Sequence, residues 1–315
     1  MKAVFSRKGF DQGYGGMPSP ILPDGRLVPL PIPSDHDRTL IDNVGFDDLD
    51  LDAMLRDLSG GKYSAKSTVH YDPDLGGSHT ASIPGWRPAF GQSGAAQGHL
   101  SNNGVGPGDV FLFFGWYRQV ETLSGRWRFV PSAPDIHVMF GWLEIDEVLS
   151  VVTDRAGSLK RHPWIATHPH VATPGRYTDP RNTLYVARKR SIFVNGIGGG
   201  RFPSMLPQLQ LTRAGRTRSV WSLPSWFEPK GRAALTYHPS ATRWELDGDR
   251  VTLKTAAKGQ EFVIDGKDYP ELDRWVANLV GEAASNCSCA LSKGAVTTSI
   301  AGLATRAALT LQWRG

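Results

Sequence analysis

Two short segments contain the residue types that most often bind divalent metal ions in proteins. In the first, His70, Asp72 and Asp74 alternate with other residues, so in an extended chain their side chains lie on one side. In the second, one proline separates His168 from His170. A mixed set of imidazole and carboxylate ligands suits iron, manganese or zinc. If the two segments meet, they form a divalent metal site with His70 as a catalytic candidate. The alternative is that the aspartates only shape a turn around the proline between them.

A basic segment follows the expected first strand and could bind a phosphate group. It consists of Ser6, Arg7 and Lys8, and a glycine comes next. Basic side chains and backbone N–H groups at the end of a strand are a common phosphate-binding arrangement, although the glycine spacing here is not that of a P-loop. Asp11, shortly afterwards, is a candidate catalytic carboxylate. The alternative is that these are ordinary loop residues.

Residues 97–118 combine a polar cluster, a glycine-rich turn and the most apolar run of the chain. Gln97 and His99 are two residues apart, so in an extended loop their side chains point the same way. Histidine exchanges protons near neutral pH and glutamine can read the edge of a base, so His99 is a catalytic candidate and Gln97 a binding candidate. Trp116 and Arg118 end the apolar run, where they could stack on a base and bind its phosphate. A packed aromatic pair beside an arginine that reaches solvent is the alternative.

Arginines alternate with small polar residues in LTRAGRTRSVWSLPSWF, and tryptophans follow them. Arg218 is the last of these arginines and precedes Trp221. Basic side chains interleaved with aromatic ones are typical of nucleic-acid-binding surfaces, so Arg218 is predicted to contact the substrate. An edge strand protected by charge explains the pattern equally well.

The elements that position these candidates are predicted to form a β-rich α+β fold. Val110–Tyr117 is apolar and aromatic enough for a strand that is buried on both faces. Lys2–Arg7 is predicted as a first strand, and residues 76–108 as a loop that leads into the central strand. Further strands are expected over residues 126–130, 135–152 and 182–189, with a β-meander over 244–264.

Helices are expected to be few and peripheral. Leu51–Leu58 has apolar residues at helical spacing between a possible cap, Asp50, and a terminating glycine pair; a second helix is expected over 270–283. Residues 1–284 are predicted to form a single domain with a mixed sheet or a PUA-like barrel at its core. Residues 285–315 contain no acidic side chain and are expected to be an appended tail that need not be ordered.

The composition is that of a soluble globular protein: 315 residues, of which 40% are hydrophobic and 21% charged. No apolar run approaches the ~20 residues of a membrane span, and the N-terminal apolar segment is too short for a signal peptide. The two cysteines, Cys287 and Cys289, offer no zinc set, which favours a reducing, cytoplasmic setting. The net charge of +5 is concentrated in the middle and C-terminal half, which suits a nucleotide or DNA partner, although a solvated surface explains it as well.

The order of several motifs resembles a known family. The blocks follow one another across most of residues 1–228: SRKGFD, GGMPSPILPDG, LPIP, HYDPDL, FGQSGAAQGHL, GVGPGDVFLFFGWYR, HPH, NTLYVA and LTRAGRTRSVWSLPSWF. This series resembles the nucleotide modification associated domain family, the third of that name, which occurs in bacteria and phages and was named from gene neighbourhoods linked to modification of DNA bases. The resemblance implies a modification system with other proteins as partners, and no particular reaction.

A second, shorter similarity concerns two strands. PGDVFLFFGWYR followed by VMFGWLEIDEVLSV is similar to the strand pair of PUA-like barrels, including the EVE and ASCH domains. Those barrels often bind modified or flipped bases.

The function expected from these observations is that of a cytoplasmic component of a DNA or nucleotide base-modification system, which binds and could modify a base or nucleotide. Whether it is an enzyme stays open at this point, with the sequence favouring one. The alternatives are a non-catalytic reader of modified bases and a metal-dependent enzyme that acts on a small molecule. A divalent metal is the cofactor that the residues suggest.

Overall fold

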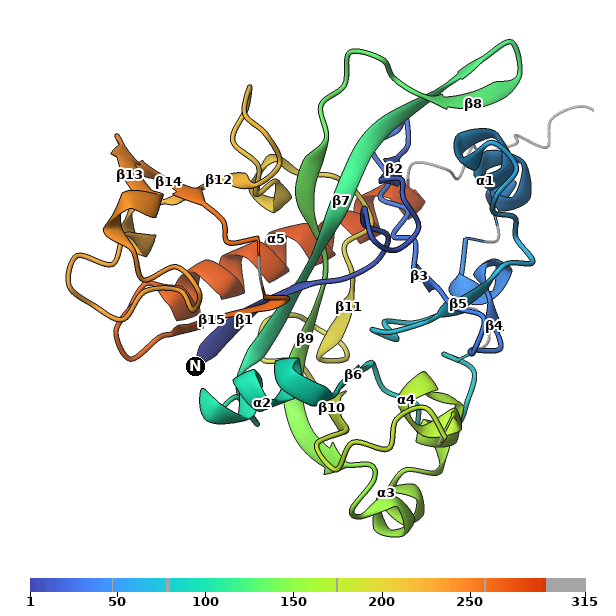
Figure 1. The fold of residues 1–315 in the computed structure, drawn as a ribbon, viewed down its shortest axis with the longest axis horizontal. Helices are drawn as coiled ribbons and strands as arrows, with labels where there is room; N and C mark the ends of the chain where they lie inside the picture. The colour runs from blue at the N-terminus through green and yellow to red at the C-terminus, as the bar shows by residue number, and fades with distance from the viewer. Residues whose placement is uncertain (47, 78–79, 174, 258, 293–315) are drawn as a thin grey trace, which may run out of the picture.

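A mixed β-sheet forms the centre of the computed structural model, which describes residues 1–46, 48–77, 80–173, 175–257 and 259–292, with side chains to residue 284 (Figure 1). The main path of this sheet has the strand order β15-β1-β7-β9-β10-β6. Its strands are Lys2–Arg7 (β1), Ala89–Gln92 (β6), Val110–Leu123 (β7), Ile136–Ser150 (β9), Thr183–Ala187 (β10) and Glu261–Asp265 (β15). β1 runs parallel to β7 and the other neighbours are antiparallel, which confirms the predicted mixed sheet and α+β class.

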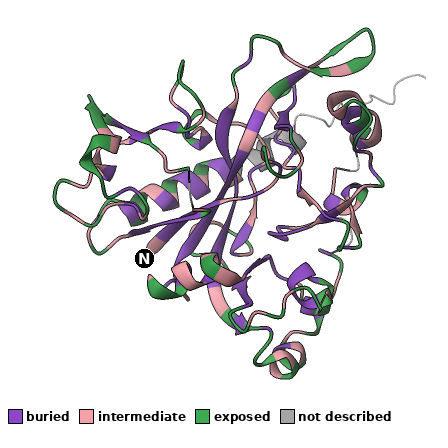
Figure 2. Ribbon diagram, viewed as in Figure 1, coloured by how far each residue is buried: buried purple, intermediate pink, exposed green. Residues whose placement is uncertain are grey.

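Strand β7 is buried on both faces over its first half, as its apolar run predicts (Figure 2). On one face, the ring of Phe90 packs edge-on against Phe111 and Phe113, with centroids 4.9 and 5.3 Å apart. On the other face, Phe114 lies edge-on against Trp221 at 5.0 Å. Burial of large aromatic side chains on both faces fixes β7 as the centre of the core.

Helix α5 (Leu272–Ser292) crosses one face of the sheet (Figure 1). Its apolar residues Leu272, Val276 and Val280 are buried in the main core, and the ring of Trp275 lies 6.1 Å from that of Phe5 in β1. The helix expected over 270–283 is therefore present, and it continues to Ser292. The first residues of the expected tail 285–315 are helical, and residues 293–315 lie outside the described part.

Two small sheets flank the central one. The first contains β12 (Val220–Pro224), β14 (Arg250–Lys254) and β13 (Trp244–Asp247), and the second contains β3 (Ile32–Pro33), β5 (Thr68–His70) and β4 (Thr39–Leu40). Helix α1 (Leu51–Ser59) lies beside the second small sheet (Figure 1). Its ends are those predicted: Asp50 Oδ1 accepts a hydrogen bond from the N–H of Ala53, and Gly60 adopts a left-handed conformation with φ +64°.

The remaining elements are short. Strands β2 (Ser19–Ile21) and β8 (Arg126–Phe129) pair with β7, and β11 (Gly199–Arg201) pairs with β9. The other helical segments are α2 (Gly94–Asn102), α3 (Arg155–Arg161), α4 (Pro169–Ala172), η1 (Ile41–Val44), η2 (Pro163–Thr167), η3 (Pro207–Leu209), η4 (Ser225–Phe227) and η5 (Ala241–Arg243). None of the described helices is both long and apolar enough to span a membrane.

The two edges of the main path are joined by side chains and not by backbone pairing. Gln92 of β6 donates a hydrogen bond from Nε2 to Glu261 Oε1 of β15, at 2.7 Å. Lys8 Nζ contacts the same oxygen at 2.8 Å and lies 4.4 Å from the centre of the Phe90 ring. No ladder joins β6 to β15 among the described strands, so the expected PUA-like barrel does not close.

Two expectations about secondary structure are wrong. Residues 76–108 are not simply a loop, because they contain β6 and α2. The glycines Gly94 and Gly98 are poor helix formers and hid the helix. The meander over 244–264 is also incomplete: β13 pairs with β14, but β15 leaves them and pairs with β1. Long-range pairing with the first strand is not encoded in the local alternation.

The buried Lys8–Glu261 pair should be important for stability. Both side chains are at most 9% exposed, so replacing Lys8 with methionine leaves an uncompensated buried carboxylate. We expect Lys8→Met to lower the free energy of unfolding by about 3–5 kcal/mol, and the additional change Glu261→Gln to recover much of that loss. Urea unfolding measures both effects. Lys2→Met, which breaks a partly exposed pair with Asp109, is the matched control and should cost about 1 kcal/mol or less. A loss of similar size in both single variants would contradict this account.

Candidate functional site

Four of the predicted metal-ligand candidates, His70, Asp72, His168 and His170, meet in one cluster, here called the histidine–aspartate centre. His70 ends β5, and the two other histidines flank Pro169, the first residue of α4. Asp72 Oδ2 is 3.8 Å from His70 Nε2 and 3.7 Å from His170 Nε2, whereas Oδ1 is 3.3 Å from His168 Nε2. Ligand atoms of His70, Asp72 and His170 all lie within 4.8 Å of one another. The two segments singled out by spacing therefore lie together in space.

Further contacts fix the orientation of two imidazoles. His170 Nδ1 is 2.6 Å from Asn182 Oδ1, and the amide of Asn182 donates to the carbonyl of His170 at 3.0 Å. His70 Nδ1 is 3.2 Å from Asp37 Oδ2. Partners of this kind on Nδ1 leave Nε2 of each ring directed at Asp72, which is the usual arrangement around metal-bound histidines.

His168 is oriented differently from the other two histidines. Its Nδ1 accepts a hydrogen bond from the N–H of His170, at 3.3 Å, so in the neutral ring the hydrogen is on Nε2. That hydrogen is on the atom that faces Asp72 Oδ1, the same oxygen that accepts from the N–H of Gly91 at 2.8 Å. Oδ1 is thereby engaged by the N–H of Gly91, and Oδ2 lies between His70 and His170.

The close packing of the centre against β6 requires glycine at position 91. A Cβ atom there would lie 2.3 Å from the His170 ring, far inside van der Waals contact. Gly91 also donates the backbone hydrogen bond to Asp72. The strand can approach the imidazole and the carboxylate this closely because residue 91 has no side chain.

The electrostatics give the centre an ionised carboxylate beside a neutral imidazole, that of His170. Burial, with smaller contributions from His70 and His168, lowers the pKa of His170 to about 3. Burial by itself raises the pKa of the Asp72 carboxyl, but the contact with His168 and the charge of His170 bring it to about 2. At neutral pH, Asp72 is therefore negative and His170 is uncharged, which are the protonation states that metal binding needs.

One side of the centre is more open. Tyr177 places its hydroxyl 3.1 Å from His70 Nδ1, and its ring stacks on His170 with centroids 4.1 Å apart. Burial raises the pKa of Tyr177 above its usual range, so the hydroxyl keeps its proton. Arg176, with a side chain that is 37% exposed, contacts Ser34 and Asp37 beside it.

Asp74, the fifth candidate ligand, faces away from the centre. Its carboxylate accepts hydrogen bonds from the indole of Trp86 at 2.9 Å and from the hydroxyl of Thr80 at 3.1 Å. Burial raises its pKa. The alternation that places Asp72 and Asp74 on one side breaks down because β5 ends at His70 and a proline follows Asp72.

Several predicted substrate-binding residues line a separate cleft of about 770 Å³. It contains Arg7 and Asp11 from the end of β1, Trp116 from β7, and Arg218 from the segment before β12. The guanidinium of Arg218 lies 4.2 Å from the centre of the Trp116 ring. Residues distant in sequence are thus brought together as basic and aromatic walls of one cleft.

Ser6, Lys8 and Arg118 lie elsewhere. Ser6 is fully buried, and its hydroxyl has no hydrogen-bond partner among the described residues. Lys8 is engaged in the interior with Glu261. Arg118 donates hydrogen bonds to the carbonyl oxygens of Val130 and Pro131, next to the β7–β8 hairpin.

Gln97 and His99 lie on α2, so the expectation of an extended loop with both side chains pointing one way is wrong. Gln97 is buried and accepts a hydrogen bond from the hydroxyl of Tyr185, at 3.1 Å. His99 Nε2 is 3.0 Å from Thr236 Oγ1, and its ring lies 4.5 Å from that of Tyr237. Burial lowers the pKa of His99. Residues two apart on a helix point to different sides.

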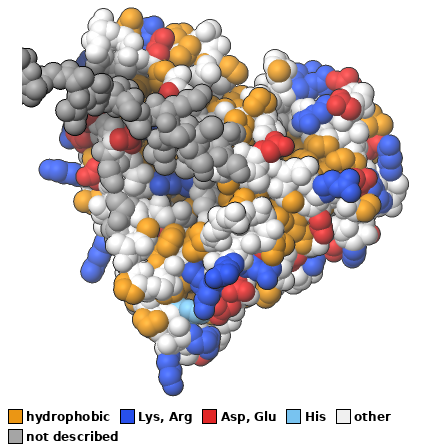
Figure 3. Space-filling model, turned by 180° about the vertical axis from the view of Figure 1, so that it is seen from behind, with side chains coloured by type: hydrophobic (Ala, Val, Ile, Leu, Met, Phe, Trp, Pro, Cys, Tyr) orange, Lys and Arg blue, Asp and Glu red, His pale blue; other side chains and the backbone are white. Residues whose placement is uncertain are grey.

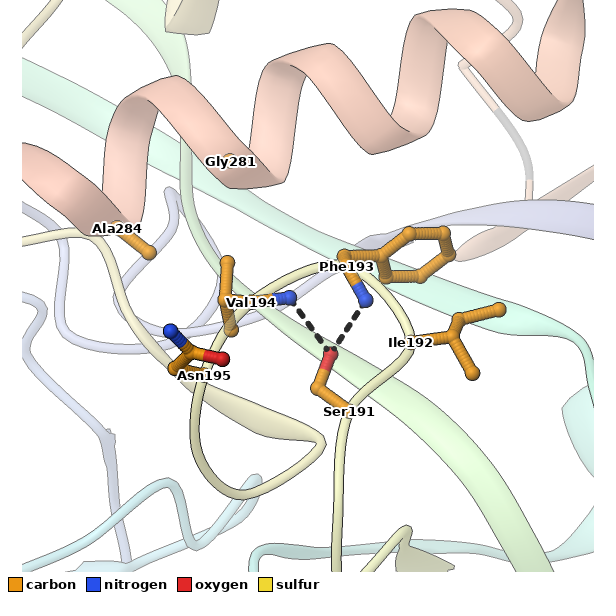
Figure 4. Close-up of a pocket in the computed structure, with 7 residues that line it drawn as sticks. All are labelled: Ser191, Ile192, Phe193, Val194, Asn195, Gly281 and Ala284. Carbon is orange, nitrogen blue, oxygen red and sulfur yellow. Dashed lines mark hydrogen bonds between the residues drawn. The ribbon is translucent and has the colours of Figure 1, made fainter.

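A further hollow, of about 550 Å³, lies between residues 191–195 and α5 (Figure 4). Ser191 accepts hydrogen bonds from the backbone N–H groups of Phe193 and Val194, so its hydroxyl closes a local turn. None of the described residues that line this hollow is ionisable, so they offer no group for acid–base chemistry.

Asp37, Tyr177 and Asn182 contact the histidine–aspartate centre, and Arg176 contacts Asp37; none of the four was identified from the sequence. Asp37 is one of many aspartates in the acidic N-terminal part, and nothing in its spacing singles it out. Asn182 stands at the start of the predicted strand 182–189. The position of Asn182, a polar residue at the start of a strand and close in sequence to the His168–His170 pair, is the one feature of the sequence that could have indicated its role.

Histidine burial should make the protein less stable in mild acid. Burial, together with the charges of Arg218 and Arg7, lowers the pKa of His137 to about 3, and its Nδ1 accepts a hydrogen bond from Trp221. Between about pH 6.5 and 3, the unfolded chain therefore binds a proton at this histidine that the folded chain does not, so stability falls as the pH falls.

For His137 alone, the expected slope is about 1.4 kcal/mol per pH unit over that window. Urea unfolding between pH 6 and 4, with a chelator present, should show a slope that is smaller by about one proton in His137→Gln than in the parent. Equal slopes in the two proteins would show that His137 is not held in its neutral form.

Comparison with known proteins places the chain in a family. Residues 2–265 match the family described as nucleotide modification associated domain 3. Comparisons with curated proteins and with solved structures found no significant match. The matched region includes the central sheet, the histidine–aspartate centre and the cleft. The chain therefore belongs to the nucleotide modification associated domain 3 family, whose name links it to nucleotide modification systems.

Proposed function

We propose that this protein is a metal-dependent enzyme that modifies a nucleotide or a DNA base, with a divalent metal bound by His70, Asp72 and His170. The observation that carries the proposal is the convergence of His70, Asp72 and His170, with ligand atoms within 4.8 Å of one another, in a centre that is almost entirely buried. The family supplies the context of nucleotide modification, and the residues supply the metal chemistry.

The donor set indicates the class of metal. Two imidazole nitrogens and one carboxylate oxygen suit iron, manganese or zinc, and they leave coordination positions open for water or substrate. A metal held in this way can act as a Lewis acid and can activate a bound water molecule. The partners on the far nitrogens, Asp37 and Asn182, support the same interpretation because they orient the rings before any metal arrives.

The ionised Asp72 in an almost fully buried site argues against a purely structural cluster. A buried carboxylate is destabilising unless donors or cations surround it. Asp72 Oδ1 has a backbone donor at Gly91, but Oδ2 lies between two Nε2 atoms at 3.7 and 3.8 Å, which is too long for a hydrogen bond. A cation between these three atoms would complete the coordination of Oδ2.

Substrate would approach from the side of Tyr177 and Arg176, which is the less buried side of the centre. Tyr177 retains its proton and can donate a hydrogen bond to a substrate oxygen or to metal-bound water. Arg176 offers a cation to an anionic group. In this scheme, His70 is a ligand and not a proton-transfer residue, since its Nε2 faces Asp72.

Metal analysis of the full chain tests the proposal. After loading with Fe²⁺, Mn²⁺ or Zn²⁺ under anaerobic conditions, we expect about one tightly bound ion per chain, and none in Asp72→Asn or His170→Ala. Asn182→Ala, which removes only the partner of His170, should weaken metal affinity by about 10–100-fold. His162→Ala is the matched control, because this histidine pairs with Glu147 outside the centre, and it should leave metal binding unchanged.

Mass spectrometry of nucleosides from cells or reactions that contain the complete modification system provides the second readout. The modified nucleoside should disappear with Asp72→Asn and persist with His162→Ala. A wild-type protein that holds no metal under any loading condition would overturn the proposal. So would an Asp72→Asn variant that supports normal modification; a protein that binds modified DNA without metal or turnover would be a reader.

A further inference from the structure

The cleft lined by Arg7, Trp116 and Arg218 has the features of an anion site. Burial lowers the pKa of Arg218; the charge of Asp135 opposes this shift, and the charge of Arg7, which lines the same cleft, adds to it. No carboxylate lies within ion-pair distance of either guanidinium among the described residues. Two guanidinium groups in one cleft, neither of them in a direct ion pair with a described carboxylate, favour the binding of an anion there.

The shape and the other walls point to more than an inorganic ion. A volume of about 770 Å³ is within the range of small-molecule sites and well above what one phosphate group needs. The guanidinium of Arg218 lies over the face of the Trp116 ring, 4.2 Å from its centre. The indole Nε1 of Trp116 has no hydrogen-bond partner among the described residues, and such groups often mark a site that a ligand or water completes.

Hydroxyl groups add to the anion-binding character. Thr217 and Ser219, which precede and follow Arg218 in the sequence, line the cleft, and their side-chain oxygens are 3.4 Å apart. Hydroxyls, guanidinium groups and an aromatic face are the set that proteins use for a phosphate with an attached base. The acidic lining residues, Asp11 and Asp135, limit the positive charge to one part of the cleft.

We propose that this cleft binds one nucleotide, with its phosphate at Arg7 and Arg218 and its base stacked on Trp116. This inference rests on the proposed function, nucleotide or base modification. It adds the substrate class, a nucleoside phosphate, and the residues that bind it. On the face that Figure 3 shows, basic side chains are interspersed with acidic ones. A free nucleotide and one nucleotide of a single strand share the chemistry that the cleft recognises.

The cleft is connected to the histidine–aspartate centre through the end of β1. Arg7 and Phe10 line the cleft, and Gly9 borders a small cavity that Asp72 also borders. Gly9 has φ +82°, and a Cβ atom there would lie 2.8 Å from the carbonyl oxygen of Leu30, so this connection tolerates no side chain. The segment that contributes Arg7 to the cleft thus continues to the neighbourhood of Asp72.

Isothermal titration calorimetry with metal-free, full-length protein tests the cleft apart from the metal. The ligands are a deoxynucleoside 5′-monophosphate, the matching deoxynucleoside, inorganic phosphate and a short single-stranded oligonucleotide. We expect the monophosphate to bind more tightly than either the nucleoside or inorganic phosphate, and binding to weaken with added salt. Tighter binding of the oligonucleotide than of the monophosphate would identify a DNA strand as the source of the nucleotide.

Variants separate the cleft from general surface charge. Arg7→Gln and Arg218→Gln should each weaken binding by about tenfold or more, and Trp116→Leu should weaken nucleotide binding by about 5- to 100-fold without affecting inorganic phosphate. Arg213→Gln is the matched control: Arg213 belongs to the same arginine series but contacts Asp247 and Thr252, and it should change binding less than twofold.

Two results would overturn the proposed nucleotide site. One is no binding of any phosphate-bearing ligand, and the other is a loss of affinity in Arg213→Gln as large as that in Arg218→Gln. If the nucleotide-site proposal is wrong, the metal content of the protein is unaffected. Failure of the metal proposal would leave these titrations unchanged, because they are made with metal-free protein.

Discussion

The ionised carboxylate of Asp72 is buried where β5, β6 and α4 meet, and this one charge constrains all three. A carboxylate removed from water is tolerated only where donors or cations replace the water. The N–H of Gly91 supplies one donor, and the imidazoles of His70, His168 and His170 enclose the rest. Glycine at position 91 follows from the same constraint, since a methyl group there would collide with His170. The centre therefore constrains the packing of the fold and is also the proposed metal site.

Strand β6 separates two polar clusters with different roles, because successive residues of a strand face opposite sides. Phe90 and Gln92 face the interior, where Gln92 meets the buried Lys8–Glu261 pair and helps to hold the edges of the sheet together. Gly91 faces the histidine–aspartate centre, which has a partly exposed arginine and tyrosine beside it. The same four-residue strand thus serves stability on one face and the proposed metal site on the other.

The local features of the fold and the central ligand candidates could be predicted from the sequence. β7 and α1 could be predicted because their apolar patterns and caps are local. The residues of the histidine–aspartate centre could be named from their spacing, but their partners Asp37 and Asn182 come from distant segments that no local pattern links to them. The predicted side-chain orientation was wrong where the secondary structure was wrong. Gln97 and His99 were expected to point the same way from a loop, but they lie on helix α2 and point to different sides. The convergence of the cleft residues depends on the pairing of β1 with β7, which is long-range.

The most direct measurement is the anomalous diffraction of crystals of the full chain loaded with Mn²⁺ or Zn²⁺. The account predicts one strong peak at about 2.0–2.2 Å from His70 Nε2, Asp72 Oδ2 and His170 Nε2, with His168 and Asp74 not coordinated. A saturated crystal with no peak at this position, or with its strongest peak bound by other residues, would contradict the central claim.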